Sequence, residues 1–158
     1  MSTRASDAAT RWLGPEEEHA WRAYRRMVTV VQARTAQDLA ELGLSEPDYE
    51  VLSTLSERTD GTSTLREQAA KMEWSRSRLS RHASRMETRG LLRRAPDPAD
   101  GRGCLLVLTE RGLDTLRQAA PTHVASVRRH FVDRLDPQEL ATLGRIAAKL
   151  AGEPKDCP

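Results

Sequence analysis

Aromatic residues are scarce in this 158-residue chain, at 4% of the sequence, although hydrophobic residues make up 38%. A core with so few rings has to be built from Leu, Val, Ala and Met, which pack well between helices. A compact domain of this length buries about 70% of its unfolded surface and needs no disulfide staples. The composition therefore favours one mainly helical domain.

Cysteine is scarce as well. Cys104 and Cys157 are too few for a disulfide framework, and no metal-ligand spacing surrounds them. No apolar run reaches 18 residues, and the first residues lack the apolar segment of a signal peptide. We therefore expect a soluble, cytoplasmic protein in a reducing compartment, with no membrane contact, no metal and no cofactor.

Asparagine is absent, and the usual motifs of enzymes are missing too. The chain has no Gly-rich phosphate loop, no HExxH motif and no paired cysteine ligands. His123 and His130 have no recognisable nucleophile beside them in the sequence. We therefore expect no catalytic residues and no enzyme.

Positive charge gathers in one segment. Residues 65–102 hold ten basic and five acidic side chains, a balance of +5 in a chain whose net charge is +2. A basic block in a near-neutral chain is typical of a protein that binds a polyanion. A solvated Arg-rich helix face is the alternative that charge alone leaves open.

Cap signals and apolar spacing predict the first two helices. Pro15 and the three acids after it begin a helix whose apolar stripe includes Trp21 and Tyr24. A second apolar set widens this stripe, so the helix either packs in an ordinary core or faces a second subunit. Ser45 and Asp48 form a capping box that begins the next helix.

Two short helices follow in close succession. Thr64 and Glu67 form a second capping box, and a fourth helix is expected from about Ser75 to Arg89 with Gly90 as its left-handed cap. At 100° per residue, Leu79, Ala83 and Met86 share the inner face of the fourth helix. Its outer face is then Arg and Ser.

The rest of the chain predicts a hairpin and two further helices. Residues 91–94 and 104–108 read as two short strands around a turn-rich segment. Thr109 caps a long helix whose apolar stripe runs to Leu135, with a bend near Pro121. Asp136 begins the last helix.

This order of elements resembles the MarR family of regulators from about Glu16 to Leu150. Three stretches carry the resemblance: LSRHASRMETRGLL at 79–92, DPADGRG at 97–103 and LTERG at 108–112. It implies a mainly α fold with a small β-hairpin wing, in which a winged helix-turn-helix domain joins a helical dimerisation region. The implied divisions are a polar leader (1–15), an N-terminal dimerisation helix (16–44), the DNA-binding region (45–108), C-terminal dimerisation helices (109–151) and a disordered tail (152–158).

The resemblance also implies a function. Family members are transcriptional regulators, so we expect a homodimeric repressor that binds double-stranded DNA at a palindromic operator and is released by a small-molecule effector. A ligand-independent DNA-binding or architectural protein of the same winged fold is the alternative.

The residues expected to contact DNA lie on the fourth helix and the wing. Small polar and Arg side chains near the start of a recognition helix reach base edges, and their neighbours reach phosphates. Asp100 and Arg102 match the Asp-any-Arg pattern of the family's wing, in which the Arg enters the minor groove; an exposed turn is the other interpretation. His82 is either a contact residue or a boundary histidine packed on the core. The expected recognition-helix residues are Ser75, Arg76, Ser77, Arg78, Ser80, Arg81, His82 and Arg85.

Family members often bind an aromatic or anionic ligand between the dimerisation helices and the DNA-binding region. The residues that could line such a pocket here are Trp21, Tyr24, Arg25, His123 and Arg128. Trp and Tyr at helical spacing are also common in cores, which is the other interpretation.

Overall fold

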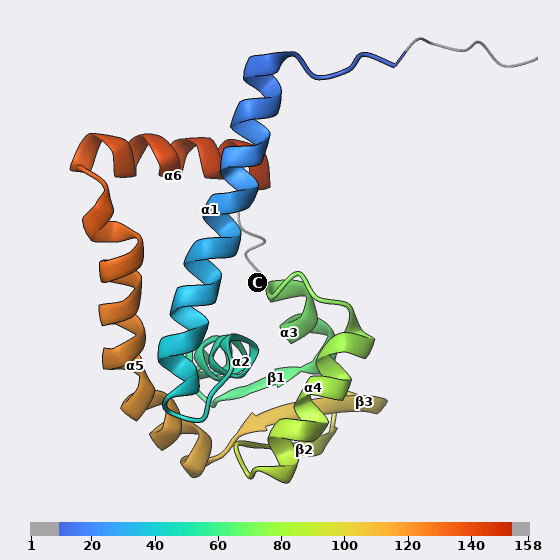
Figure 1. The fold of residues 1–158 in the computed structure, drawn as a ribbon. Helices are drawn as coiled ribbons and strands as arrows, with labels where there is room; N and C mark the ends of the chain where they lie inside the picture. Colours follow the sequence, from blue (N-terminus) through green and yellow to red (C-terminus); the bar gives the residue numbers. More distant parts are fainter. Residues whose placement is uncertain (1–9, 153–158) are drawn as a thin grey trace, which may run out of the picture.

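The computed structural model describes residues 10–152, and it confirms the mainly α fold with a wing (Figure 1). Apart from β1 and the 3-10 helix η1, which were not predicted, the elements follow the order expected from the sequence. They are α1 (Pro15–Ala40), α2 (Glu46–Ser56), β1 (Thr62–Thr64), α3 (Leu65–Lys71), α4 (Arg76–Thr88), β2 (Leu92–Asp97), β3 (Asp100–Leu108), α5 (Glu110–His130), the 3-10 helix η1 (Val132–Arg134) and α6 (Pro137–Ala151).

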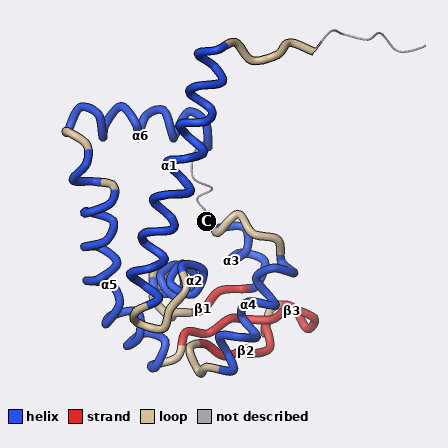
Figure 2. The backbone as a smooth tube through the Cα atoms, in the orientation of Figure 1, coloured by secondary structure: helices blue, strands red, loops and turns tan. Residues whose placement is uncertain are grey.

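The elements form two parts. Helices α2, α3 and α4 and the small sheet form one compact part, which we call the reading head (Figures 1 and 2). Helix α1 packs against α5, and α5 also contacts α2. Helix α6 crosses near the upper half of α1, away from the reading head (Figure 1). The long helices therefore extend well beyond the part that contains the sheet.

The sheet has three strands within the described residues, one more than the hairpin predicted from the sequence. The strand order is β1-β3-β2, and both pairings are antiparallel. Thr62 pairs with Val107, and Thr64 pairs with Leu105. Strand β1 is a Thr-Ser-Thr segment without apolar alternation. Its strand conformation therefore depends on pairing with the edge of β3. The wing strands β2 and β3 also run further towards the turn than predicted.

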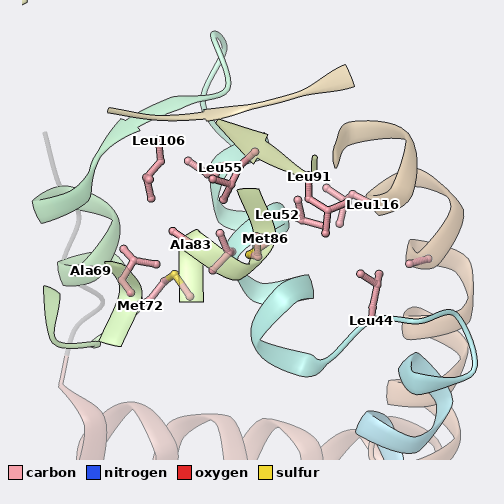
Figure 3. Packing of buried hydrophobic residues seen from close by; sticks show 14 of the residues in the cluster. Leu44, Leu52, Leu55, Ala69, Met72, Ala83, Met86, Leu91, Leu106 and Leu116 are labelled. Carbon is pink, nitrogen blue, oxygen red and sulfur yellow. The ribbon is translucent and has the colours of Figure 1, made fainter. Parts of the chain in front are cut away.

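The hydrophobic core lies inside the reading head, where Leu side chains from α2, α4 and the sheet meet (Figure 3). Leu79, Ala83 and Met86 are fully buried, which confirms the predicted inner face of α4. Leu52 and Leu55 of α2 are buried against them. The outer face of α4 is thereby fixed towards solvent.

Local hydrogen bonds explain where the helices of the reading head begin and end. Ser45 Oγ accepts from the Asp48 backbone N–H at 3.2 Å, and Asp48 Oδ2 accepts from the Ser45 N–H at 3.0 Å, as the capping box predicted. Helix α4 ends at Thr88, and two residues later Gly90 takes the predicted left-handed conformation with φ 73°. Both signals are local, and both are confirmed.

Helix α5 differs from its prediction at its C-terminal end. The helix continues across Pro121 but ends at His130, not near Leu135, because Phe131 leaves the helical conformation with φ −134° and ψ −69°. A short 3-10 turn follows before Asp136 caps α6. In Figure 1 the path of α5 bends between its lower and upper turns.

A polar cluster joins the C-terminal half of α5 to α1. Asp38 Oδ2 accepts hydrogen bonds from the buried Ser126 Oγ at 2.5 Å and from Arg129 Nη2 at 2.7 Å. These hydrogen bonds, that of Ser126 first, lower the pKa of Asp38 although partial burial opposes them. The carboxylate therefore stays charged and holds α1 to α5.

The chain ends are described only in part. Residues 10–14 of the predicted leader precede α1 without regular structure. The rest of that leader, and the predicted tail beyond Gly152 with Cys157, lie outside the described residues. Within residues 10–152, no helix combines the length and hydrophobicity required to cross a membrane, and no cluster of potential metal ligands occurs.

Candidate nucleic-acid interface

Helix α4 presents a basic and polar face to solvent. Ser75 is its N-cap, with its Oγ accepting from the Arg78 backbone N–H at 3.2 Å. The exposed members of the predicted set are Ser75, Arg76, Ser77, Arg78, Arg81 and Arg85. Unpaired N–H groups at a helix N-terminus attract anions, and here the first turn also carries two Arg side chains. The N-terminal end of α4 is therefore suited to binding a phosphate group.

Trp74, which the sequence prediction did not include, supports this face. The Arg78 guanidinium lies 3.7 Å from the centre of the Trp74 ring. Stacking of this kind favours a defined position for the cation without neutralising it. Arg78, in the first turn of α4, is therefore held in a defined position with its charge exposed. A single Trp before a helix gives no sequence signal for this contact.

His82 faces inward, not towards the open face of α4. Only 8% of the residue is exposed, so the boundary interpretation holds and a direct reach to base edges does not. Its Nε2 lies 3.0 Å from Asp48 Oδ1, and the Trp74 ring meets it edge-on at 83°. The charged partner on α2 draws the imidazole inward. The helical wheel alone could not show that partner.

Ser80 is also less available than its place on the helix suggested. Arg94 of β2 donates from Nη2 to the Ser80 carbonyl at 2.6 Å and to Ser80 Oγ at 3.2 Å. The Arg94 backbone N–H donates to Glu87 Oε1 at 3.0 Å. Ser80 and Arg94 therefore join α4 to β2.

The wing residues Asp100 and Arg102 lie at the exposed end of the β2–β3 hairpin. Asp100 Oδ1 accepts from the backbone N–H of Arg102 at 3.1 Å, so this carboxylate shapes the turn through the backbone. Gly103 has no room for a side chain, since an added Cβ would lie 2.9 Å from Asp97 Cβ. The tight turn thereby projects Arg102 into solvent.

A cavity of about 740 Å³ lies between the reading head and the long helices. It is lined by residues of α1, α2, α4 and α5, and its acidic and basic members are Glu46, Glu50, Arg78 and His123. Burial raises the pKa of Glu50, with Glu46 acting in the same direction and Arg78 against them. The apolar part comes from Val31, Ala36, Val127 and Phe131.

The structure does not bring the five predicted pocket residues together. Of these five, only His123 lines the cavity, with its ring tilted by 32° against that of Tyr49 at 4.1 Å between centres. Trp21 and Tyr24 stack on each other at 5.7 Å on the exposed first half of α1. The cavity lies against the second half of α1, so the residues in the first half of that helix lie outside it. Arg25 is exposed beside the aromatic pair, and Arg128 pairs with Asp133 at 2.8 Å.

A second surface exposes large apolar side chains on the long helices. Helix α6 has no buried residue, although Leu and Ile recur along it at helical spacing. Large exposed apolar side chains that gather into a patch usually mark an interaction surface. The exposed members on α1, α5 and α6 are Trp21, Tyr24, Val124, Ile146 and Leu150.

Comparison with known proteins gives consistent results. The family model described as "MarR family" matches residues 42–103. Transcriptional regulator HosA of Escherichia coli O111:H- is 30% identical over 130 residues, which cover 82% of this chain and 94% of HosA.

Two solved structures from Streptomyces coelicolor are also similar. AbsC, a MarR family transcriptional regulator, is 42% identical with a TM-score of 0.86, over 90% of this chain and 96% of AbsC. Sco3205, a MarR family transcriptional regulator in complex with DNA, is 34% identical with a TM-score of 0.87, over 92% of this chain and 91% of Sco3205.

Proposed function

Because the chain belongs to the MarR family of DNA-binding transcriptional regulators, we propose that it is a cytoplasmic repressor that binds a palindromic operator as a homodimer. A small molecule releases it from this operator. The observation that carries the DNA-binding role is α4, which buries one face completely in the core and exposes Arg78, Arg81 and Arg85 on the other.

Each DNA contact is proposed from where its side chain lies. Ser77, Arg78 and Arg81 are placed to reach base edges in the major groove, while Ser75, Arg76 and Arg85 hold the phosphates. Arg102, at the tip of the wing, enters the adjacent minor groove. Ser80 and His82 support α4 from within. Catalysis has no part in this proposal.

Dimerisation is supported by the exposed apolar surface of the long helices. We assign it to residues 16–44 and 109–151, whose Trp21, Tyr24, Ile146 and Leu150 would be buried between two copies. Sedimentation equilibrium is expected to give twice the 17.7 kDa chain mass at micromolar concentration. A monomer that binds a half-site as tightly as the full operator contradicts this assignment.

The operator is tested by selecting duplexes from a random pool with the wild-type protein. The expected motif is an inverted repeat whose half-sites lie about 10 base pairs apart, one helical turn. Arg81→Ala serves as the control, since loss of a guanine contact costs about 1 to 3 kcal/mol and relaxes one position of the motif. Recovery of duplexes without a shared motif contradicts sequence-specific regulation.

The proposed effector occupies the cavity between the reading head and the long helices. That position supports control of the spacing between two reading heads, without competition for the DNA surface. The test is a thermal-shift screen of small organic acids and amines, followed by operator titrations with each hit. A true effector and the operator must weaken each other's binding by the same factor.

Variants of the cavity complete this test. Val127→Trp is expected to fill the cavity and abolish the response, while Gln118→Ala, at an exposed position of α5 outside the cavity, keeps the response. If no molecule that binds the cavity changes operator affinity, the ligand-independent DNA-binding role replaces the effector-controlled one.

A further inference from the structure

Three side chains form a chain of contacts from the interior of the reading head to the DNA-facing surface. Asp48 of α2 is 4% exposed, and its Oδ1 lies 3.0 Å from His82 Nε2. On the other side of the imidazole, Arg85 Nη2 lies 3.0 Å from His82 Nδ1. Buried carboxylate, buried imidazole and exposed guanidinium thus follow one another.

The contact with Arg85 fixes the tautomer of His82. A guanidinium has only donors, so Nδ1 must accept the hydrogen bond and carries no proton. The proton of the neutral ring is then on Nε2, which lies 3.0 Å from the charged Asp48 Oδ1. The pair is held by electrostatic attraction, because Nε2 makes no hydrogen bond of ordinary geometry among the described residues. Asp48 therefore favours the one neutral tautomer that can hold Arg85.

The position of Asp48 is itself fixed from two sides. Its Oδ2 accepts from the Ser45 backbone N–H at 3.0 Å and from Arg89 Nη1 at 2.7 Å. Arg89 also donates from Nη2 to the Gly43 carbonyl at 2.7 Å. Burial raises the pKa of Asp48, but the bonds from Ser45 and Arg89 outweigh it, so that the net pKa is lowered. The carboxylate is therefore charged and rigid.

We propose that Asp48 and His82 are positioning residues that hold Arg85 in its DNA-binding orientation, through a hydrogen bond that exists only while His82 is neutral. The inference deepens the proposed function, because it requires that Arg85 contacts DNA. A side chain that is already ordered loses less conformational entropy on binding. The two residues thereby strengthen DNA binding without touching DNA.

The inference makes DNA binding depend on pH in a defined direction. The charged groups that face His82 are Asp48 from α2 and Arg78 and Arg85 from α4, while Trp74 packs on its ring. Burial lowers the pKa of His82, and the two Arg side chains add to this, whereas Asp48 opposes them. The ring is therefore neutral near pH 7. As the pH falls through its lowered pKa, a proton on Nδ1 faces the Arg85 donors and breaks the contact.

A double-mutant cycle tests whether His82 acts through Arg85. The probe is a duplex selected by the wild-type protein, titrated at pH 7.5. His82→Leu is expected to weaken binding about three- to tenfold, the cost of ordering one long side chain. Combined with Arg85→Ala, it adds no further loss. With Arg81→Ala as the matched control, the two losses multiply, because no hydrogen bond links Arg81 to His82 among the described residues.

Two further measurements separate positioning from a merely structural role. As the pH falls from 7.5 through the lowered pKa of His82, the wild-type protein is expected to lose up to about three- to tenfold more affinity than His82→Asn, which keeps an acceptor oxygen but does not titrate. His82→Asn is also expected to lose less affinity at pH 7.5 than His82→Leu. Losses that multiply in the His82–Arg85 cycle, or equal pH profiles, overturn the inference.

Nitrogen NMR of the free protein tests the Asp48–His82–Arg85 contacts in the absence of DNA. The expected spectrum shows the His82 ring protonated at Nε2 near pH 7, and Asp48→Asn shifts this towards a mixture of tautomers. Protonation of His82 at Nδ1 in the wild-type protein near pH 7 would contradict the proposed hydrogen bond from Arg85 to His82. If the spectrum is as expected but the protein binds no duplex, the proposed function fails, while the contacts among Asp48, His82 and Arg85 are confirmed.

Discussion

Helices α4 and α6 have similar lengths, 13 and 15 residues, but they differ in how much of their surface is buried. Helix α4 buries Leu79, His82, Ala83 and Met86, whereas α6 buries none of its residues. Both sequences have an apolar stripe, so amphipathicity alone does not explain the difference. The reading head completes its own core, whereas the long helices leave apolar side chains exposed, which the proposed homodimer would bury. The predictions below test this contrast.

The largest effect is expected from the core of the reading head. Leu79→Ala should lower the free energy of unfolding by about 2 to 5 kcal/mol, because it leaves a cavity among fully buried neighbours. The loss in a urea titration should not depend on protein concentration. Leu150→Ala, whose residue is 76% exposed, should change only the concentration-dependent part of stability. Equal behaviour of the two variants contradicts the contrast.

Gly112→Ala is expected to cost about 3 kcal/mol by pushing α5 away from the reading head. An added Cβ would lie 1.9 Å from the Leu91 carbonyl oxygen, and backbone cannot yield as a flexible side chain does. Thermal unfolding measures the loss. Gly144→Ala on α6 is the matched control, because nothing lies within 4 Å of its added Cβ. It should leave the monomer's stability unchanged or slightly raised.

Asp48→Asn should cost about 2 kcal/mol at pH 7, since hydrogen bonds to a charged group contribute about 1.5 to 3 kcal/mol. The lowered pKa of Asp48 means that the wild-type protein keeps this stability above the ordinary aspartate pKa of 3.8 and loses it as pH falls through the lower folded-state value. The gap between wild type and variant should therefore narrow in acid. Urea titrations at pH 7 and pH 3 measure it, and a constant gap contradicts the assignment.

The smallest effect concerns Arg85, which has no part in the core. Arg85→Ala should leave stability nearly unchanged and make the salt dependence of DNA binding shallower by about 0.9 in the log-log slope, the effect of one lost phosphate contact. Titrations over a range of salt concentrations give the slope. An unchanged slope means that Arg85 does not reach a phosphate.

Local signals predicted much of the fold. The capping box at Ser45, the left-handed Gly90 and the inner face of α4 each depend on residues within a few positions of one another. Strand β1 escaped prediction because its pairing partner is more than 40 residues away and its own pattern is not alternating.

The candidate site was less predictable than the fold for the same reason. Helical geometry placed the exposed Arg side chains of α4 correctly, but it could not supply the partners that other elements bring. Asp48 and Arg89 meet across 41 residues, and Arg94 of strand β2 reaches Ser80 on α4. The cavity lining also depends on how far along α1 the other helices pack. A single helical wheel contains none of these distances.

The junction between α4, β2 and α5 has a mechanical consequence. Thr109 Oγ1 donates to the Gly90 carbonyl at 2.7 Å, and Gly112 brings α5 against the Leu91 backbone, so the base of α5 is fastened to the end of the recognition helix. The 21 residues of α5 then act as a lever arm about 30 Å long. A tilt of about 6° at its far end displaces the reading head by about 3 Å, close to the 3.4 Å rise of one base step. In the proposed homodimer, a small rotation where the two copies meet would thus shift each reading head along the DNA.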